Sequence, residues 1–215
     1  MKAYCLKYAR STLPERMVFA KGDWEKRIPI SFAIYCIQVG SRNILVDAGC
    51  DTMPGFEMDW ISSPAAVLQA AGLTAAEITD VVLTHSHHDH IDGIKHFENA
   101  VIHITKTEYE KGKTYLPEGA SVNAFETEYQ LAPGVRIVLW GGHATGSAIV
   151  ELAVGEAIHV FAGDECYTNA NIRERIPTGA CANPEKALEF IQKYSQKPYI
   201  VHTCHDQTLK TERII

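Results

Sequence analysis

The feature that most constrains this chain is the block THSHHDHIDG, residues 84–93, which directly follows the apolar run Val81–Leu83. Four potential metal ligands fall close together in it: His85, His87, Asp89 and His90. Residues two apart on an extended chain point the same way, so His85 and His87 can face one ion. Asp89 and His90 follow a bend toward the next helix and can face a second ion. Imidazole and carboxylate ligands suit Zn²⁺ or a similar first-row cation, so the block predicts a metal site at the end of a buried strand.

Apolar patterning predicts strands on both sides of the block. We expect them at Ala3–Tyr8, Ile30–Val39, Asn43–Val46, Val81–Leu83, Val101–Ile104, Arg136–Trp140, Ala148–Val154, Ala157–Ala162 and Tyr199–His202. Helices are expected at Pro64–Ala71, after a capping box at Thr74–Glu77, at Ile91–Phe97 and at Pro184–Lys193. In the last helix, Asn183 is the expected N-cap, and Leu188, Ile191 and Tyr194 are expected on one apolar face. Two strand-rich halves that both carry helices predict two sheets packed face to face with helices outside.

The length and charge of the chain narrow the class of protein. A chain of 215 residues suits one domain, residues 1–215, and we find no internal repeat or low-complexity linker. The formal net charge of −6 argues against a nucleic-acid partner, because such proteins present basic surfaces to phosphates.

The chain also lacks the sequence signals of membrane insertion and export. Its apolar stretches fall far short of the roughly 20 residues needed to span a bilayer, so no membrane partner is expected. The N-terminus has no apolar run followed by a small-residue cleavage site, which predicts a cytoplasmic protein. The six cysteines are scattered without a CxxC pair, and we expect free thiols.

Five segments together resemble the metallo-β-lactamase superfamily. They are Asp47 in LVDAG, the HxHxDH block, His143 in GGHATGS, Asp164 in FAGDECY and His205 in HTCHD, and they occur in that family's order. The resemblance runs from about Ile30 to Asp206. It implies a four-layer αββα sandwich of the α/β (α+β) class, which the strand pattern alone only allows.

The same resemblance implies a dinuclear metal site. His85, His87 and His143 would hold the first ion, Asp89, His90 and His205 the second, and Asp164 would bridge the two. Asp47 would brace the ligand loop. The two glycines before His143 permit a close backbone approach there. His205 is preferred to His202 as the last ligand because His202 should still lie within a strand.

The remaining histidines are expected to be structural or exposed: His88, His96, His103 and His159. One family of di-iron oxygen- and nitric-oxide-reducing proteins of this fold carries an acidic residue at the position of His87, so the histidine here favours a hydrolase. The resemblance therefore implies two divalent ions, zinc first, with iron, manganese or cobalt also suited to these ligands.

Within the superfamily, the chain looks most like the N-acyl homoserine lactonase branch. Tyr167 lies three positions after Asp164, and the segments TKTEYEKGK and His205-Asp206 also resemble that branch. The likeness implies a small-molecule ester or lactone substrate whose carbonyl is attacked by a metal-bridging hydroxide. Tyr167 would hydrogen-bond the developing oxyanion, and Asp89 would protonate the departing ring oxygen.

Other features of the sequence leave alternatives open. GGHATGS lacks the proline and second histidine often seen as GHxPGH in relatives. Met53, Phe56, Met58 and Trp60 could form an apolar wall near the site, or simply pack, and Tyr167 could be an ordinary packing tyrosine. Another hydrolase of this fold, acting on a thioester as glyoxalase II does or on a phosphoester, is the alternative function. A non-catalytic metal-binding module is disfavoured, because a structural zinc site needs only four ligands and this chain offers seven.

Overall fold

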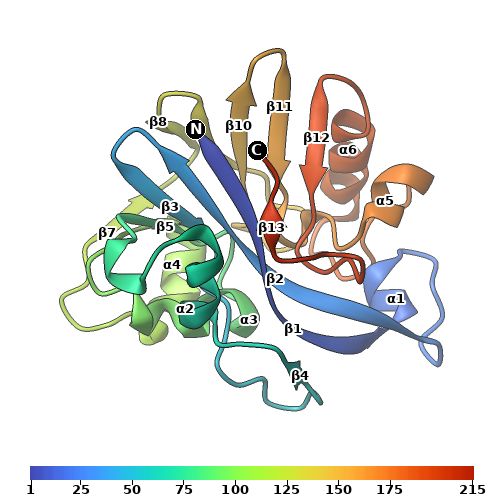
Figure 1. Cartoon of the computed structure of the whole chain (residues 1–215). Helices are drawn as coiled ribbons and strands as arrows, with labels where there is room; N and C mark the ends of the chain where they lie inside the picture. Colours follow the sequence, from blue (N-terminus) through green and yellow to red (C-terminus); the bar gives the residue numbers. More distant parts are fainter.

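The computed structural model describes residues 1–215 and contains two β-sheets with helices on their outer faces (Figure 1). The first sheet has the order β13-β1-β2-β3-β5-β6-β7, with β4 paired to β1. Its strands are β1 (Lys2–Pro14), β2 (Arg27–Val39), β3 (Arg42–Val46), β4 (Asp59–Trp60), β5 (Asp80–Val82), β6 (Val101–Thr105), β7 (Val122–Phe125) and β13 (Glu212–Arg213). The second sheet has the order β12-β11-β10-β9-β8. Its strands are β8 (Glu128–Ala132), β9 (Val135–Leu139), β10 (Ala148–Val154), β11 (Ala157–Phe161) and β12 (Tyr199–His202).

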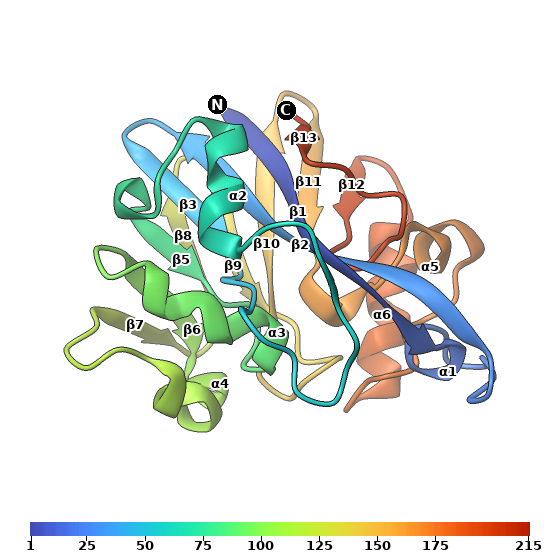
Figure 2. The same ribbon diagram turned by 60° about the horizontal axis from the view of Figure 1, so that its bottom comes forward.

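The helical segments are short except for the last one. The α-helices are α1 (Glu15–Val18), α2 (Pro64–Val67), α3 (His88–Ile91), α4 (Lys106–Gly112), α5 (Asn169–Glu174) and α6 (Pro184–Tyr194). The 3₁₀ turns are η1 (Leu68–Ala71), η2 (Ala75–Glu77), η3 (Asp92–His96), η4 (Lys113–Tyr115) and η5 (Gly163–Glu165). Figure 2 shows α2 and α3 over the outer face of the first sheet, and α6 on the far side of the second.

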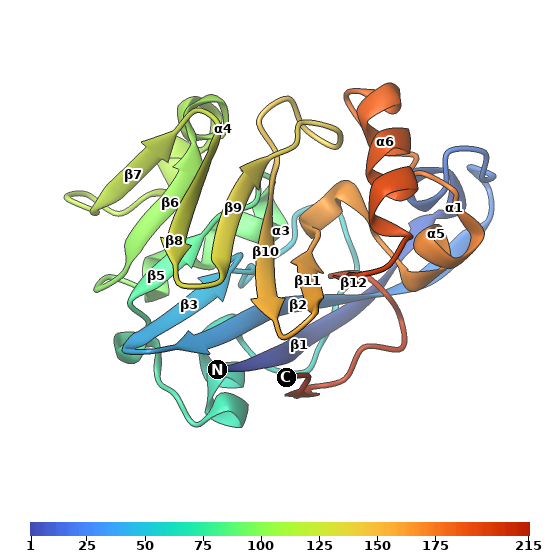
Figure 3. The same cartoon turned by 90° about the horizontal axis from the view of Figure 1, so that it is seen from above.

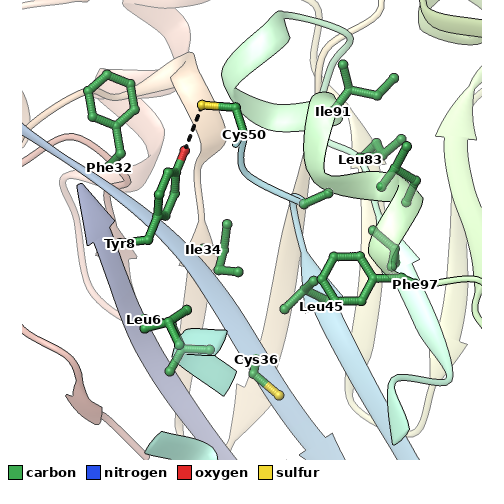
Figure 4. Packing of buried hydrophobic residues seen from close by; sticks show 14 of the residues in the cluster. Leu6, Tyr8, Phe32, Ile34, Cys36, Leu45, Cys50, Leu83, Ile91 and Phe97 are labelled. Carbon is green, nitrogen blue, oxygen red and sulfur yellow. Dashed lines mark hydrogen bonds between the residues drawn. The ribbon is translucent and has the colours of Figure 1, made fainter. Parts of the chain in front are cut away.

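Three apolar clusters separate these layers. The cluster between the two sheets includes Ile37 and Val82 from the first and Ile137 and Val150 from the second. A second cluster packs the first sheet against α2, η1, α3 and η3, and Figure 4 shows part of it, including Leu45, Ile91 and Phe97. The third packs β10 and β11 against α6. Since each sheet is buried on both faces, the expected four-layer αββα arrangement is confirmed, as the view from above also shows (Figure 3).

Strand direction brings the chemistry-bearing segments to one edge of the sandwich. In the first sheet β3 and β5 run parallel, so Asp47 after β3 and His85 after β5 emerge at the same end. In the second sheet β11 and β12 run parallel, and Asp164 and His205 emerge after them at their shared end. Side chains up to 158 residues apart, those of Asp47 and His205, are thereby delivered to the same region.

The helix expected at Ile91–Phe97 begins earlier, as α3 at His88, and continues as η3 to His96, whereas the other expected helix starts are confirmed. The Ser63 hydroxyl accepts from the amide of Ala66, and Gly72 adopts a left-handed φ of 72° after η1. Thr74 and Glu77 form the capping box. The Asn183 side chain accepts from the amides of Glu185 and Lys186 at the start of α6.

The expected apolar face of α6 is confirmed at Ile191 and Tyr194 and is wrong at Leu188. Leu188 is 43% exposed, whereas the buried side chains are Ala187, Phe190, Ile191 and Tyr194. These four follow the i, i+3, i+4, i+7 spacing of a core-facing stripe, and Leu188 lies beside it.

The first two strands extend beyond the expected segments. β1 continues past Tyr8 to Pro14 and pairs with β2 down to Arg27, with a register shift between Lys7 and Ala9. This long hairpin carries α1 at its tip, and Leu13 and Met17 from it line the cavity described below.

No helix in the structure is long and apolar enough to cross a bilayer.

Candidate metal centre

Seven side chains predicted as ligands converge at the shared edge of the two sheets. They are His85, His87, Asp89, His90, His143, Asp164 and His205. Two groups of possible ligand atoms lie there, each within 4.8 Å of one another: His85, His87, His143 and Asp164 in one, and His90, Asp164, Cys204 and His205 in the other.

The first group surrounds one oxygen of Asp164. Oδ2 of Asp164 lies 3.3 Å from Nε2 of His143 and 3.8 Å from Nε2 of His85. Nδ1 of His87 lies 2.9 Å from Nε2 of His143. Three imidazoles and one carboxylate oxygen thus face a common point.

The second group surrounds the other oxygen of the same carboxylate. Oδ1 of Asp164 lies 3.2 Å from Nε2 of His90 and 3.1 Å from Nε2 of His205. Oδ2 of Asp89 lies 3.5 Å and 3.6 Å from the same two nitrogens. One carboxylate therefore stands between two sets of imidazoles, with a separate oxygen toward each.

Two buried nitrogens in this cluster lack a hydrogen-bond partner. They are Nε2 of His85 and Nε2 of His90, on side chains that are 0% and 2% exposed. An unsatisfied buried polar atom costs about 1–3 kcal/mol, so such atoms call for an explanation. A cation in each group would accept these lone pairs, and the donor set of neutral imidazoles and carboxylates fits a divalent metal.

The outward-facing nitrogens of four histidines, in contrast, all have partners. Nδ1 of His85 contacts Oγ1 of Thr84 at 3.1 Å, Nδ1 of His90 donates to Oδ2 of Asp47 at 2.8 Å, Nδ1 of His143 donates to the carbonyl of Ala180 at 2.6 Å, and Nδ1 of His205 donates to the carbonyl of Ser31 at 2.9 Å. These contacts orient the rings so that each Nε2 points inward, which is the arrangement that prepares a histidine to bind a metal.

Burial and charge set opposite pKa shifts within the cluster. Burial lowers the pKa of His85 well below its ordinary value, and the nearby His90 and His143 rings reinforce the effect. Burial alone would raise the pKa of Asp164, but the adjacent charges of His90, His205 and His143 bring it well below the usual range. Burial alone would lower the pKa of His90 and His205, but Asp164 raises both. Neutral His85 and ionised Asp164 are thus in the forms that bind a cation, whereas a cation would replace a proton on His90 and His205.

Tyr167 is 4% exposed and lies between two of these histidines. Its ring centroid is 5.0 Å from that of His205 and 5.9 Å from that of His143. Burial raises the pKa of its hydroxyl well above the ordinary value, so the group is a hydrogen-bond donor.

A cavity of 280 Å³ opens beside the cluster. The polar residues that line it are His87, His88, Asp89, His143, Asp164, Tyr167 and His205, and the apolar ones are Leu13, Met17, Phe32, Met53, Phe56 and Ala180. A groove of 890 Å³ adjoins it and shares Met17 and Phe56.

The expected apolar wall is correct only in part. Met53 and Phe56 line the cavity, and Met58 lines the adjoining groove. Trp60 lines neither; it is 41% exposed and stacks on Tyr8 at 6.4 Å. Leu13 and Met17 come from the β1 extension and α1, which the sequence pattern did not predict.

The other histidines contribute no ligand atom to the two groups, although His88 lines the cavity beside them. His88 contacts the carbonyl of Thr52 and the hydroxyl of Tyr115, and His103 pairs with Asp80 at 2.9 Å. His202, within β12, stacks on His159 and Phe161. All six cysteines are unpaired.

Cys204, which lies beside the candidate ligand His205 in the sequence, donates to Oδ1 of Asp164 at 3.3 Å. Other residues at the site were not singled out from the sequence. Thr84 joins Asp47 to His85. The buried carboxylates of Glu108 and Glu165 hold the loops that carry the histidines. Two positions in the sequence could have pointed to these residues. Glu165 directly follows Asp164, and Ser147 occupies the position where relatives often carry a second histidine.

Comparison with known proteins agrees with this geometry. A sequence model described as "Metallo-beta-lactamase superfamily" matches residues 33–205. An N-acyl homoserine lactonase of Bacillus thuringiensis is 27% identical over 139 residues, which are 60% of this chain and 55% of the relative. The match thus spans about half the length of that relative.

Solved structures share the fold over nearly the whole chain. A structure of an N-acyl homoserine lactone hydrolase, with the product N-hexanoyl-L-homoserine bound at its catalytic metal center, has a TM-score of 0.82 at 21% identity and covers 99% of this chain and 98% of that one. AidC, a dizinc quorum-quenching lactonase, has a TM-score of 0.77 at 16% identity and covers 96% of this chain and 87% of that one.

Proposed function

The chain belongs to the metallo-β-lactamase superfamily, and we propose that it is a metal-dependent hydrolase that opens the lactone ring of N-acyl homoserine lactone-like substrates. The observation that carries this proposal is the position of Asp164. Its two carboxylate oxygens face two separate sets of imidazoles, beside a cavity large enough for a small organic molecule.

We assign six of the seven ligands to one or the other of two divalent cations and the seventh to both, and zinc is the first choice given the imidazole-rich donor set. His85, His87 and His143 would hold the first ion, Asp89, His90 and His205 the second, and Asp164 would contact both. When bound, such a pair of ions lowers the pKa of water and polarises a carbonyl oxygen.

Two side chains of the cavity fit the remaining chemical tasks. The Tyr167 hydroxyl, which keeps its proton because it is buried, can donate a hydrogen bond to the oxyanion that forms when the lactone carbonyl is attacked. Asp89 lines the same cavity and is positioned to carry a proton to the ring oxygen as the C–O bond breaks.

The cavity also favours an acylated substrate over a wholly polar one. Its lining combines the candidate ligands with apolar side chains such as Leu13, Met53 and Phe56. An ester carbonyl at the candidate ligands would leave an attached acyl chain within reach of these apolar side chains. The net charge of −6 supports a small-molecule partner rather than a nucleic acid, and the six free cysteines fit the cytoplasm as the place of action.

A hydrolysis screen of the metal-replete protein tests the proposal. The substrates are N-acyl homoserine lactones, glutathione thioesters, β-lactams and phosphodiesters, each with and without a chelator. We expect the largest kcat/KM for the lactones and loss of turnover on chelation. A larger kcat/KM for thioesters or phosphodiesters would replace lactone opening with the corresponding hydrolysis.

A further inference from the structure

The loop Gly141–Ser147, between β9 and β10, carries His143 and is held at both ends by buried carboxylates. Glu165 contacts the beginning of the loop and Glu108 contacts its end. Both side chains are almost fully buried, at 0% and 1% exposed.

Glu165 accepts hydrogen bonds from the backbone of the candidate metal ligand His143. Its Oε1 accepts from the amides of Gly142 at 3.0 Å and His143 at 3.1 Å, and the hydroxyl of Ser147 donates to the same oxygen. A Cβ atom on Gly142 would lie 2.3 Å from Oε2 of Glu165, so this approach requires glycine at that position. The carboxylate and the glycine are therefore fitted to one another.

Glu108 connects the same loop to the HSH segment, residues 85–87. Its Oε1 accepts from the amide of Gly146 at 3.1 Å. Its Oε2 accepts from the amide of Ser86 at 3.1 Å and from the Ser86 hydroxyl at 2.6 Å. Ser86 stands between His85 and His87, so a single side chain couples the two loops that supply the three histidines of the first group.

The two carboxylates differ in how their charge is balanced. Nζ of Lys111 lies 2.7 Å from Oε1 of Glu108, whereas no side-chain nitrogen of Lys, Arg or His lies within 4.0 Å of the Glu165 carboxylate. Burying a carboxylate without a cationic partner is costly, and here backbone amides of the ligand loop and one hydroxyl supply its hydrogen bonds. Glu165 is buried at this cost directly after Asp164 and against the amide of His143. This placement fits a role in orienting His143 as a metal ligand.

We propose that Glu165, together with Ser147, is a positioning residue that fixes His143 toward the first metal ion, with Glu108 setting the HSH segment against it. Glu165 touches neither the cavity nor the ligand nitrogens; it acts through the backbone of His143. The inference rests on the metal site of the proposed function, and it adds to that site the residues that orient it.

The test is the metal affinity of Glu165→Gln, measured by competition with a chromophoric chelator and by the visible absorption of the Co²⁺-loaded protein. Glutamine keeps the size but turns one acceptor into a donor that faces an amide. We expect the first ion to bind about 10- to 100-fold more weakly, with the second ion little changed, because partners of metal ligands have effects of this size. Ser147→Ala should weaken the same ion by about 5-fold, the worth of one hydrogen bond.

Glu151→Gln is the matched control. Glu151 is a buried carboxylate on β10 that accepts from Arg136 and Tyr194 and contacts no ligand loop. The Glu151→Gln substitution should lower the free energy of unfolding while leaving both metal affinities unchanged. Wild-type affinities and an unchanged Co²⁺ spectrum in Ser147→Ala, or in folded Glu165→Gln, would overturn the inference, as would equal weakening in Glu151→Gln. If the wild-type chain itself bound no metal, the proposed function would fail first, so the two failures are distinguishable.

Discussion

Asp47 accepts a hydrogen bond from Nδ1 of His90 at 2.8 Å through Oδ2, while its Oδ1 accepts the amide of Thr84 at 2.7 Å. Its backbone adopts a left-handed φ of 61°, a conformation that aspartate tolerates better than most residues. One side chain thus links the end of β3 to the segment after β5 and turns Nε2 of His90 inward. Strained backbone of this kind is concentrated at functional sites.

Asp47→Asn should therefore impair the second metal ion. Asparagine also tolerates a positive φ, but its NH₂ group would face Nδ1 of His90. That contact favours the His90 tautomer with its proton on Nε2, the nitrogen that would otherwise bind the ion. We expect about 10- to 100-fold weaker binding of one ion, read by chelator competition. Asp51→Asn is the control, because Asp51 pairs with His96 at 2.7 Å outside the cluster. Equal metal affinities in the two variants would contradict the role given to Asp47.

Removing metal should destabilise the folded chain. The imidazoles of His85 and His90 lie 4.1 Å apart between ring centroids, and both have a buried Nε2 without a partner. At a free metal concentration about 100-fold above the Kd of each site, each of the two ions would stabilise the fold by about 2.7 kcal/mol. We expect a chelator to lower Tm by about 10 °C or more, and added Zn²⁺ to restore it. A Tm that stays within about 2 °C on chelation would speak against ions in this cluster.

Replacing Tyr167 by phenylalanine tests its place in the proposed reaction. The change removes only the hydroxyl, so the apolar packing between His143 and His205 should persist. We expect kcat for a lactone to fall by about 100-fold with little change in KM, the usual size for loss of one oxyanion donor. Tyr194→Phe, remote from the cavity, is the control. Unchanged lactone kinetics would make Tyr167 a packing residue.

Local patterns predicted the parts of the site that are close in sequence. The HSHHDH block follows a short buried strand, and the alternation of two histidines there needs no information from elsewhere in the chain. The capping residues Ser63 and Asn183 were predictable for the same reason. The order of His143, Asp164 and His205 came from the family resemblance, because no local rule brings three loops together.

The features that were missed depend on contacts distant in sequence. Glu165 meets the amide of a residue 22 positions earlier, and a glutamate in a sequence ordinarily indicates a solvated side chain. The extension of β1 to Pro14 contains Arg10, Ser11 and Thr12, whose strand conformation comes from pairing with β2 rather than from apolar alternation. Leu188 was assigned to the buried face of α6 because it lies three residues before Ile191, whereas the packed stripe begins one residue earlier, at Ala187.

A buried network remote from the site offers a stability prediction with a definite pH dependence. Asp80, which is 1% exposed, accepts from Arg42 at 2.6 Å, from His103 at 2.9 Å and from Thr79 at 2.7 Å. Burial alone would raise the pKa of Asp80, but the hydrogen bonds from His103 and Thr79 and the charge of Arg42 outweigh it and lower the pKa.

Because the pKa of Asp80 is lower in the folded than in the unfolded chain, its ionisation stabilises the fold above the unfolded value of about 3.9 and ceases to do so as pH falls through the folded value. Asp80→Asn should then reduce the free energy of unfolding at pH 7 by about 1–3 kcal/mol, with the gap closing toward pH 2. Urea unfolding of both proteins at pH 7 and pH 3 measures this difference, and lactone turnover per folded molecule should not change. A gap of the same size at both pH values would show that the charge of Asp80 contributes nothing and that only its shape matters.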